Sequence, residues 1–388
     1  MTTFTYIHEP HPDIEHGFSR RPLVSYLTLP EEGLGANTGI IFFIGGYGSL
    51  PNSEYAAKLR SYLSNQYNCL AATVGYFGQE MKNRGTLVPA PDFFINLMRY
   101  HGVSVSAPHG MNRAVMFNRI ADELVNGGIA ELHPSCRLIC ESGTEYQSFG
   151  LLPAIDHLQV LNYMINNYSV SRKRIYVIGT SYGGYVALLM GKLAPGTFRL
   201  IVDNSGFVRP NGDVYGDSHS RGSIITQYGN LTVSRYEPIM WSKNPLSPRY
   251  FSLKHALIRT LLITEHQIPT TTHYFCCHWV GDIVAPFAEK ACFIESMKKI
   301  TYVEFLPVTE ANIDGSLFKE LIHGLKSSLR LLFDRAYATY LAVGGADDEI
   351  DTTDFDICSR YVFKCNECSY IFSYSRETGV SVVLAGQS

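Results

Sequence analysis

Residues 174–185 read Arg-Ile-Tyr-Val-Ile-Gly-Thr-Ser-Tyr-Gly-Gly-Tyr, and this stretch decides the fold class. Its first half is a short apolar run, which is typical of a buried strand. Gly179 and Gly183 flank Ser181 at the G-x-S-x-G spacing of a sharp strand-to-helix turn, where bulk would collide. The pattern predicts an exposed hydroxyl at a helix N-terminus, where backbone N–H groups favour developing negative charge. A glycine-rich turn without chemistry is the alternative.

Composition limits the class of protein. The chain has 388 residues, 46% of them hydrophobic, enough for a large core in one domain with insertions or in two domains. A formal net charge of -3 without a basic cluster argues against nucleic acid as a partner. No apolar run is long enough to span a bilayer, and the N-terminus lacks a secretory signal pattern. The 9 scattered cysteines indicate a reducing compartment. We expect a cytoplasmic protein, without membrane insertion or cofactor, whose oligomeric state is open.

Further apolar runs predict a parallel sheet. Residues 39–44 form a continuous apolar run that ends in a glycine-rich loop, and residues 69–76 form another. Helical spacing at residues 52–66 separates them, which gives a βαβ unit. Later runs at 198–206, 273–279 and 302–307 complete the pattern. The expected fold class is α/β, with a mostly parallel central sheet flanked by helices.

The rest of the chain suggests additions to this sheet. Residues 1–38 alternate weakly and predict an N-terminal antiparallel hairpin, and residues 39–335 form the main domain. Stretches at about 78–145 and 209–255 lack clear strands and predict insertions that act as substrate-selecting lids. Residues 336–388 predict an acidic linker and a small β segment. The remaining histidines and acids of interest are expected to be surface, capping or polar-face residues: His101, His109, Asp156 and His157.

The parts needed for acyl-transfer chemistry follow strand ends in one order. Ser181 is the predicted nucleophile, Asp282 the acid and His323 the base, the chain order that a serine hydrolase built on such a sheet requires. Asp314, in the loop before His323, is the rival acid. The predicted oxyanion donors are the backbone N–H groups of Tyr182 and of either Gly46 or Tyr47.

Two more residues are candidate substrate contacts, and one cysteine motif is a candidate metal site. Asn204, at the end of a predicted strand, and Gln147 are predicted to contact substrate, although a structural loop role for Asn204 is equally compatible. Cys365-x-x-Cys368, with Cys358 nearby, looks like half a zinc site. Because a structural zinc needs four ligands and no second pair follows, no metal is expected.

The sequence resembles the α/β-hydrolase superfamily, and locally its prolyl-oligopeptidase-like branch. The resemblance rests on residues 171–185, on Gly281-Asp-Ile-Val-Ala-Pro286 and on His323-Gly324. Residues 43–48, 146–157 and 202–206 also look like a little-studied α/β-hydrolase-like family, some members of which are encoded near bacterial flagellar and surface-glycan genes. Two departures stand out: the chain lacks a propeller-length N-terminal repeat, and Ile44 replaces the His of His-Gly-Gly.

These observations favour a serine hydrolase that acts on an ester, with an acylated carbohydrate as one candidate substrate. An acyltransferase that moves an acyl group to a sugar hydroxyl would use the same triad. A binding module that kept the fold without catalysis is the alternative of a different class.

Overall fold

The computed structural model describes most of the chain in two compact units. The first comprises Met1–Lys82, Thr144–Pro210 and Ser252–Ser388, and the second Asn83–Gly143 and Asn211–Phe251. The described residues are 2–79, 86–89, 102, 122–129, 131–132, 136–139, 146–210, 224–228, 231–235, 241, 244–345 and 350–386. His101 and His109 lie outside them.

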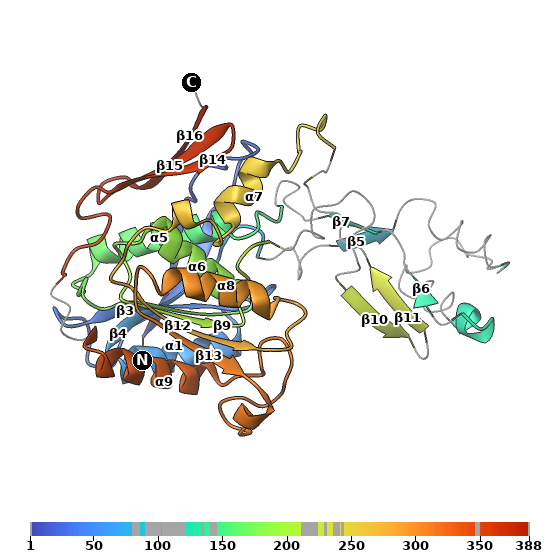
Figure 1. The fold of residues 1–388 in the computed structure, drawn as a ribbon, viewed down its shortest axis with the longest axis horizontal. Coiled ribbons are helices and arrows are strands. Elements are labelled where there is room, and N and C mark those ends of the chain that lie inside the picture. The colour runs from blue at the N-terminus through green and yellow to red at the C-terminus, as the bar shows by residue number, and fades with distance from the viewer. Residues whose placement is uncertain are drawn as a thin grey trace. The chain divides into compact units, whose positions relative to one another are not determined.

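A central eight-stranded sheet forms the middle layer of the first unit (Figure 1). Its order is β1-β2-β4-β3-β8-β9-β12-β13. The first two strands run antiparallel to their neighbours and the others are mutually parallel. This confirms the predicted α/β class. The strand bounds are Thr3–His8, Leu23–Thr28, Gly39–Ile44 (β3), Cys69–Val74 (β4), Ile175–Thr180 (β8), Leu200–Asn204 (β9), His273–Trp279 (β12) and Val303–Val308 (β13).

Helices cover both faces of the sheet, so the central strands are buried on both sides. One face packs on α1 and α9, and Ile41, Phe43 and Ile178 point into that core. The other face lies under α5, α6 and α8 (Figure 1). Burial on both faces explains why β3 and β8 are apolar without alternation. The helix bounds are Glu54–Gln66 (α1), Leu151–Asn167 (α5), Tyr182–Leu193 (α6), Leu253–Arg259 (α7), Phe287–Met297 (α8) and Leu329–Ala342 (α9).

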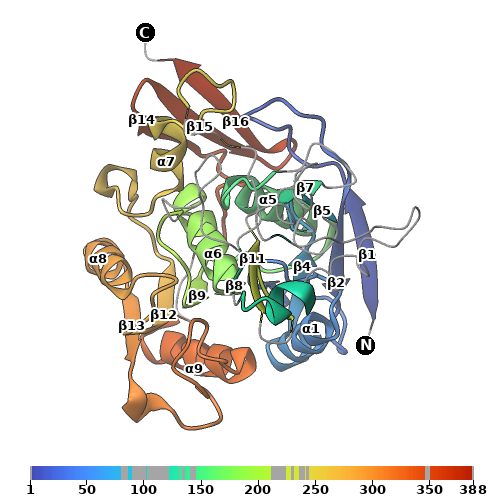
Figure 2. The same ribbon diagram turned by 90° about the vertical axis from the view of Figure 1, so that its right-hand side faces the viewer.

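The C-terminal segment forms a separate antiparallel sheet of three strands, β14 (Arg360–Cys365), β15 (Cys368–Ser375) and β16 (Gly379–Gly386). Alternate side chains of β15 are buried, as expected for a sheet with one covered face. The sheet lies beside α5 (Figure 2), where the side-chain amide of Gln159 donates to the carbonyl of Val380 at 3.1 Å. Cys365 and Cys368 are opposite each other in the strand register at the β14–β15 turn, and both are free cysteines.

The second unit joins the two predicted insertions through short strands. β5 (Thr86–Pro89) pairs with β7 (Cys136–Ile139), and β10 (Ile224–Tyr228) pairs with β11 (Leu231–Arg235). β11 also pairs with β6 (Glu131–Leu132), so the insertions share one sheet. The sequence did not predict strands here, because runs this short carry little periodic signal. The sequence also suggests a mixed helix near residues 112–126. Of these, residues 122–126 are described and are helical.

Two local expectations from the sequence were wrong. The first is a helix within residues 321–333 that begins just past His323-Gly324. Gly324, Leu325 and Lys326 follow His323 with φ of 79°, 59° and 42°, so the predicted helix cannot start there. It starts at Leu329, where the side chain of Ser328 caps the helix by accepting from the backbone N–H of Leu331.

Asp156 and His157 are fully buried, not polar-face residues. The N-terminal segment covers α5 and brings Arg20, which binds both oxygens of Asp156 at 2.8 and 2.6 Å. The charge of Asp156 is therefore paired by a residue far away in the sequence. None of the described helices is both long and apolar enough to cross a membrane.

Candidate active site

Ser181 occupies a strained turn between β8 and α6. Its φ of 54° and ψ of -121° are unusual for a residue with a side chain. A Cβ on Gly179 would collide with the carbonyl of Gly183, and one on Gly183 would collide with the carbonyl of Ile44 at the end of β3. The glycines of the G-x-S-x-G motif are therefore required by the close packing of two strand ends against the turn.

The turn brings Ser181 to a histidine and an acid from distant loops. Ser181 Oγ lies 2.7 Å from His323 Nε2, and His323 Nδ1 lies 2.8 Å from Asp282 Oδ2. With a proton on Nδ1, a neutral His323 donates to Asp282 and accepts from the Ser181 hydroxyl. The His323 side chain is 19% exposed and that of Asp282 is fully buried. This arrangement can transfer the serine proton to the imidazole.

Backbone hydrogen bonds fix the carboxylate of Asp282. Oδ1 accepts from the N–H groups of Val284 and Ala285 at 2.9 and 3.0 Å, which leaves Oδ2 for His323. Burial by itself would raise the pKa of Asp282, but the hydrogen bonds from His323 and the backbone outweigh it, so the pKa lies below its ordinary value. Asp282 therefore stays ionised beside the histidine at neutral pH.

The rival acid, Asp314, has a different local role. Its Oδ1 accepts from the backbone N–H groups of Ser316 and Leu317, both at 2.8 Å. Asp314 is exposed and closes its own loop as an Asx turn. Among the two candidate acids, the structure brings Asp282 to His323.

Asn204 supports the loop that carries His323. It is 1% exposed, and its side-chain amide donates to Thr180 Oγ1 at 3.0 Å and to the carbonyl of Gly324 at 3.1 Å. The Cys277 thiol donates to its Oδ1 at 3.3 Å. Both amide hydrogens are thus used by the protein, which favours the structural role over the predicted contact with substrate.

Two of the residues predicted to donate to the oxyanion, Tyr182 and Gly46, lie next to Ser181. The N–H of Tyr182 is the first of α6, a position that has no partner within a helix. A Cβ built on Gly46 would lie 3.5 Å from Ser181 Cβ and 4.0 Å from Oγ, so the backbone of Gly46 adjoins the serine. The Tyr47 ring packs edge-on against Tyr182, with centroids 5.9 Å apart. Whether Gly46 or Tyr47 donates stays a prediction.

Gln147 contacts the side chain that follows the serine. Its Oε1 accepts from the Tyr182 hydroxyl at 3.0 Å and from the N–H of Phe149 at 3.1 Å. The N–H of Gly150 donates back to the Tyr182 hydroxyl at 3.0 Å. Gln147 is 7% exposed, so its contact with substrate remains a prediction, whereas its contact with Tyr182 is observed.

The sequence did not reveal the ion pairs that brace this region. Arg259 Nε donates to the carbonyl of Ser148 at 2.9 Å, and its Nη2 pairs with the buried Glu15 at 2.5 Å. Lys290 Nζ pairs with Asp203 Oδ2 at 2.5 Å, beside the strand-to-helix turn at Ser181. The partners are far apart in the chain, and no local pattern marks them.

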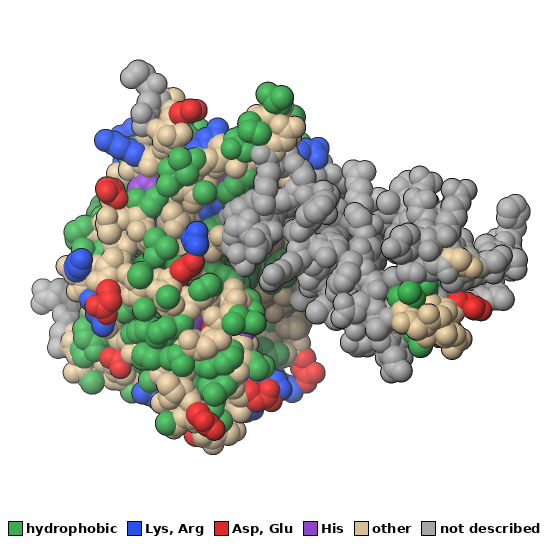
Figure 3. Space-filling model, turned by 45° about the vertical axis from the view of Figure 1, so that its right-hand side comes forward, with side chains coloured by type: hydrophobic (Ala, Val, Ile, Leu, Met, Phe, Trp, Pro, Cys, Tyr) green, Lys and Arg blue, Asp and Glu red, His purple; other side chains and the backbone are tan. Residues whose placement is uncertain are grey.

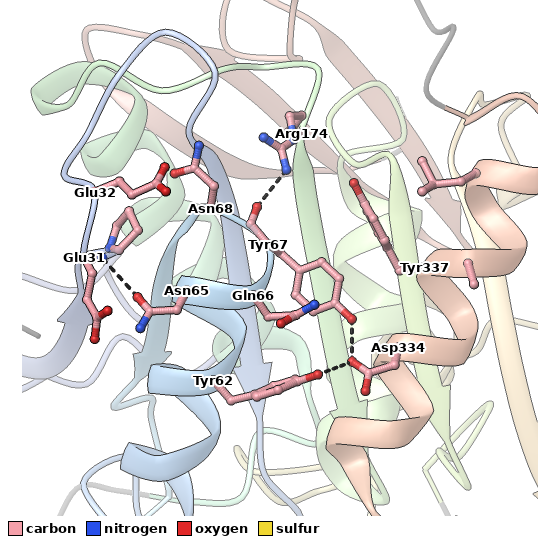
Figure 4. Close-up of a pocket in the computed structure, with 13 residues that line it drawn as sticks. Glu31, Glu32, Tyr62, Asn65, Gln66, Tyr67, Asn68, Arg174, Asp334 and Tyr337 are labelled. Carbon is pink, nitrogen blue, oxygen red and sulfur yellow. Dashed lines mark hydrogen bonds between the residues drawn. The ribbon is translucent and has the colours of Figure 1, made fainter.

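Two cavities lie at opposite ends of the parallel strands of the central sheet. One of about 250 Å³ includes Gly46 and Thr180, next to Ser181. The other, of about 700 Å³, includes Asn68 and Arg174, which precede β4 and β8, together with Asp334 of α9 (Figure 4). In it the hydroxyls of Tyr62 and Tyr67 both donate to Asp334. The larger cavity therefore lies away from the serine, about six strand residues or 20 Å along β8.

Acidic and basic side chains are interspersed on the face shown in Figure 3. Within the described part of the chain, no three His, Cys, Asp or Glu side chains come close enough to hold a metal ion.

The sequence profile of one protein family, DUF2920, described as proteins of unknown function, matches residues 108–375. The chain belongs to this family. No curated protein matches the sequence. The association with flagellar and surface-glycan genes stays a prediction.

Solved structures with similar folds include three hydrolases. A puromycin-hydrolyzing peptidase of Mycobacterium tuberculosis is 12% identical with a TM-score of 0.47, over 87% of this chain and 40% of that one. Acylaminoacyl peptidase of Pyrococcus horikoshii is 12% identical with a TM-score of 0.46, over 90% of this chain and 43% of the peptidase. Est1E of Butyrivibrio proteoclasticus with bound ferulic acid is 11% identical with a TM-score of 0.45, over 86% and 98%. The chain spans less than half the length of the two peptidases.

The strand order, the parallel strands and the turn at Ser181 make this an α/β-hydrolase fold, as the sequence resemblance implied. The likenesses to solved structures concern the fold and carry no information about substrate.

Proposed function

We propose that the protein is a serine hydrolase that cleaves an ester through an acyl-enzyme. The observation that supports this most is the hydrogen-bonded chain from Ser181 through His323 to Asp282, with distances of 2.7 and 2.8 Å. Nucleophile, base and orienting acid are all within hydrogen-bond reach, as this chemistry requires.

In the first half of the reaction, Ser181 Oγ attacks the ester carbonyl while its proton passes to His323 Nε2. The carbonyl oxygen becomes an oxyanion, stabilised by the N–H of Tyr182 and by the loop at Gly46 and Tyr47. His323 then gives its proton to the leaving alkoxide, which departs as the alcohol. Asp282 stabilises the transient imidazolium and does not itself take the proton.

In the second half, water attacks the acyl-enzyme while His323 removes a proton from it. A second oxyanion forms at the same position and collapses, His323 returns the proton to Ser181 Oγ, and the acid is released. If a bound sugar hydroxyl replaces the water, the same residues transfer the acyl group, and an acylated carbohydrate is the product.

A fluorophosphonate probe tests the nucleophile, because it reacts covalently with activated serines. We expect the wild-type protein to label and Ser181→Ala not to label, while its circular dichroism and melting temperature remain close to those of the wild type. Ser205→Ala is a matched control: Ser205 also has a left-handed backbone, with φ of 56°, and is buried at the end of the neighbouring strand β9. It should label like the wild type.

Absence of labelling in the wild type, or equal labelling of Ser181→Ala, would contradict the proposal and favour a non-catalytic binding module. Hydrolysis and transfer are separated with an activated acyl donor. Acid release that does not depend on added sugar indicates an esterase, and an acylated product formed only with sugar indicates a transferase.

A further inference from the structure

The smaller cavity is placed to receive part of a substrate bound at Ser181. Its volume is about 250 Å³, and its wall includes Gly46 and Thr180. Thr180 immediately precedes the serine, and a Cβ on Gly46 would lie 4.0 Å from Ser181 Oγ. A group attached close to the reacting carbonyl can therefore extend into this space.

The wall of the cavity is neutral. The aromatic rings of Phe43, Tyr55 and Tyr76 contribute to it, and none of the described residues that line it is Asp, Glu, Lys or Arg. A carboxylate or phosphate would find no cation there, and an ammonium group would find no anion. Because burying an unpaired charge is costly, the cavity favours an uncharged group.

Two of the lining residues carry a buried polar atom that has no hydrogen-bond partner in the described structure: Tyr76 Oη and His157 Nε2. Tyr76 is 5% exposed and His157 fully buried, so bulk water does not satisfy them. Other polar groups of the wall are used: Gln79 Nε2 donates to the carbonyl of Ser49 at 2.8 Å, and Thr73 Oγ1 donates to that of Pro51 at 2.7 Å. Buried polar atoms without partners are uncommon and cost free energy.

The two atoms have complementary hydrogen-bonding character. His157 Nδ1 lies 2.7 Å from the carbonyl of Pro153, which can only accept, so the ring proton is on Nδ1. Burial lowers the pKa of His157 to about 4, and the ring is neutral at pH 7. Nε2 therefore carries a lone pair. Burial also raises the pKa of Tyr76, which keeps its proton and can donate. The ring centroids of the two residues are 5.7 Å apart.

We propose that this cavity binds a neutral, hydroxyl-bearing part of the ester substrate, whose O–H donates to His157 Nε2 and accepts from the Tyr76 hydroxyl. This assignment rests on the proposed function of Ser181. A carboxylate, which only accepts, would leave the histidine lone pair unpaired, and a hydrocarbon would leave both atoms unpaired. Neighbouring atoms cover both groups, so the proposal requires adjacent side chains to move aside when the substrate hydroxyl binds.

The hydroxyl can belong to the acyl or to the alcohol side of the ester, and two substrate pairs distinguish these. The acyl pair is p-nitrophenyl β-hydroxybutyrate against p-nitrophenyl butyrate. The alcohol pair is glycerol monobutyrate against propyl butyrate, followed by acid release. For one of the pairs we expect the wild type to prefer the hydroxylated ester by about tenfold in kcat/KM. This ratio corresponds to the net free energy of one hydrogen bond or slightly more.

Tyr76→Phe removes the hydroxyl without changing the ring. It should bring the ratio of kcat/KM for the hydroxylated ester to kcat/KM for the plain ester close to one. Tyr370→Phe is the matched control, because Tyr370 Oη is also buried without a partner but lies on β15 of the C-terminal sheet. It should keep the preference. Equal rates for both members of both pairs, or a preference that survives Tyr76→Phe, would overturn the proposal.

Binding to Ser181→Ala separates this proposal from the proposed function. Calorimetric titration with glycerol monobutyrate and with methyl β-hydroxybutyrate should detect binding of one of them, weakened about tenfold by adding Tyr76→Phe, whether or not the wild type turns over. Binding without fluorophosphonate labelling of the wild type would refute the nucleophile and retain the hydroxyl pocket. Labelling without hydroxyl-dependent binding or selectivity would refute the pocket alone.

Discussion

Asp282 Oδ2 lies 2.8 Å from His323 Nδ1, although 41 residues separate the two in the chain. The backbone N–H groups of Val284 and Ala285 hold the other carboxylate oxygen and so aim Asp282 at the histidine. The acid and the base are therefore oriented as one unit, and the tautomer of His323 depends on the charge of Asp282.

The first prediction concerns the acid that is hydrogen-bonded to His323. Asp282→Asn should lower kcat by about 10⁴-fold, because an amide in place of the carboxylate favours the wrong tautomer of His323 and cannot stabilise its protonated form. Asp314→Asn, which alters only an exposed Asx turn, should change kcat by less than about threefold. The measurement is steady-state hydrolysis of an activated ester. The reverse ranking of the two variants would make Asp314 the acid.

The second prediction concerns the serine turn. Gly183→Ala places a methyl group against the carbonyl of Ile44, so it should destabilise the protein by about 3 kcal/mol and abolish fluorophosphonate labelling. Gly35→Ala is the control, since no atom lies within 4 Å of a Cβ built there, and its effect should stay within about 0.5 kcal/mol. Urea unfolding measures both. A neutral Gly183→Ala would show that the turn is looser than its contacts indicate.

The third prediction concerns the ion pair beside the turn. Lys290 and Asp203 are both buried, and Asp203 also accepts from the N–H of Gly206 at 2.8 Å. Lys290→Met would leave the carboxylate unpaired and should cost about 3 to 5 kcal/mol of unfolding free energy. Lys298→Met breaks an exposed pair with Glu295 and should cost less than about 1 kcal/mol. Similar losses for the two variants would contradict the difference in burial.

The fourth prediction concerns acid stability. Burial lowers the pKa of His157 to about 4, against an ordinary value of 6.5, so the folded protein binds fewer protons than the unfolded chain between these two pH values. The stability is complete above pH 6.5 and falls as the pH drops toward 4, with a loss from His157 of about 2 kcal/mol at pH 5.

His157→Gln provides the comparison for this prediction, because glutamine does not titrate and can still donate to the carbonyl of Pro153. Urea unfolding at pH 7 and at pH 5 should show a smaller acid loss in the variant, by about the 2 kcal/mol that His157 contributes. Buried histidines elsewhere with lowered pKa values add to the total loss in both proteins: His8, His11, His255, His266 and His278. Identical pH dependence in the two proteins would refute the assignment.

The sequence by itself determined the class of fold and the candidate nucleophile. Strands buried on both faces are continuous apolar runs, and the turn at Ser181 needs glycine at Gly179 and Gly183, so both signals are local in the chain. The order of serine, acid and histidine followed from the same strand ends. Local patterns failed after His323, where three left-handed residues delay α9, and in the second unit, where the strands are too short to show a period.

Only the tertiary structure decided which groups meet. It paired His323 with Asp282, left Asp314 to its own loop and turned Asn204 toward the backbone of Gly324. It also buried Asp156 beneath Arg20, 136 residues away. Among the described residues, it left Tyr76 Oη and His157 Nε2 without hydrogen-bond partners in two residues that line the smaller cavity. Contacts between distant segments depend on how packed layers bring strand ends and loops together. They leave no periodic trace in the sequence, because neither partner is constrained by its immediate neighbours.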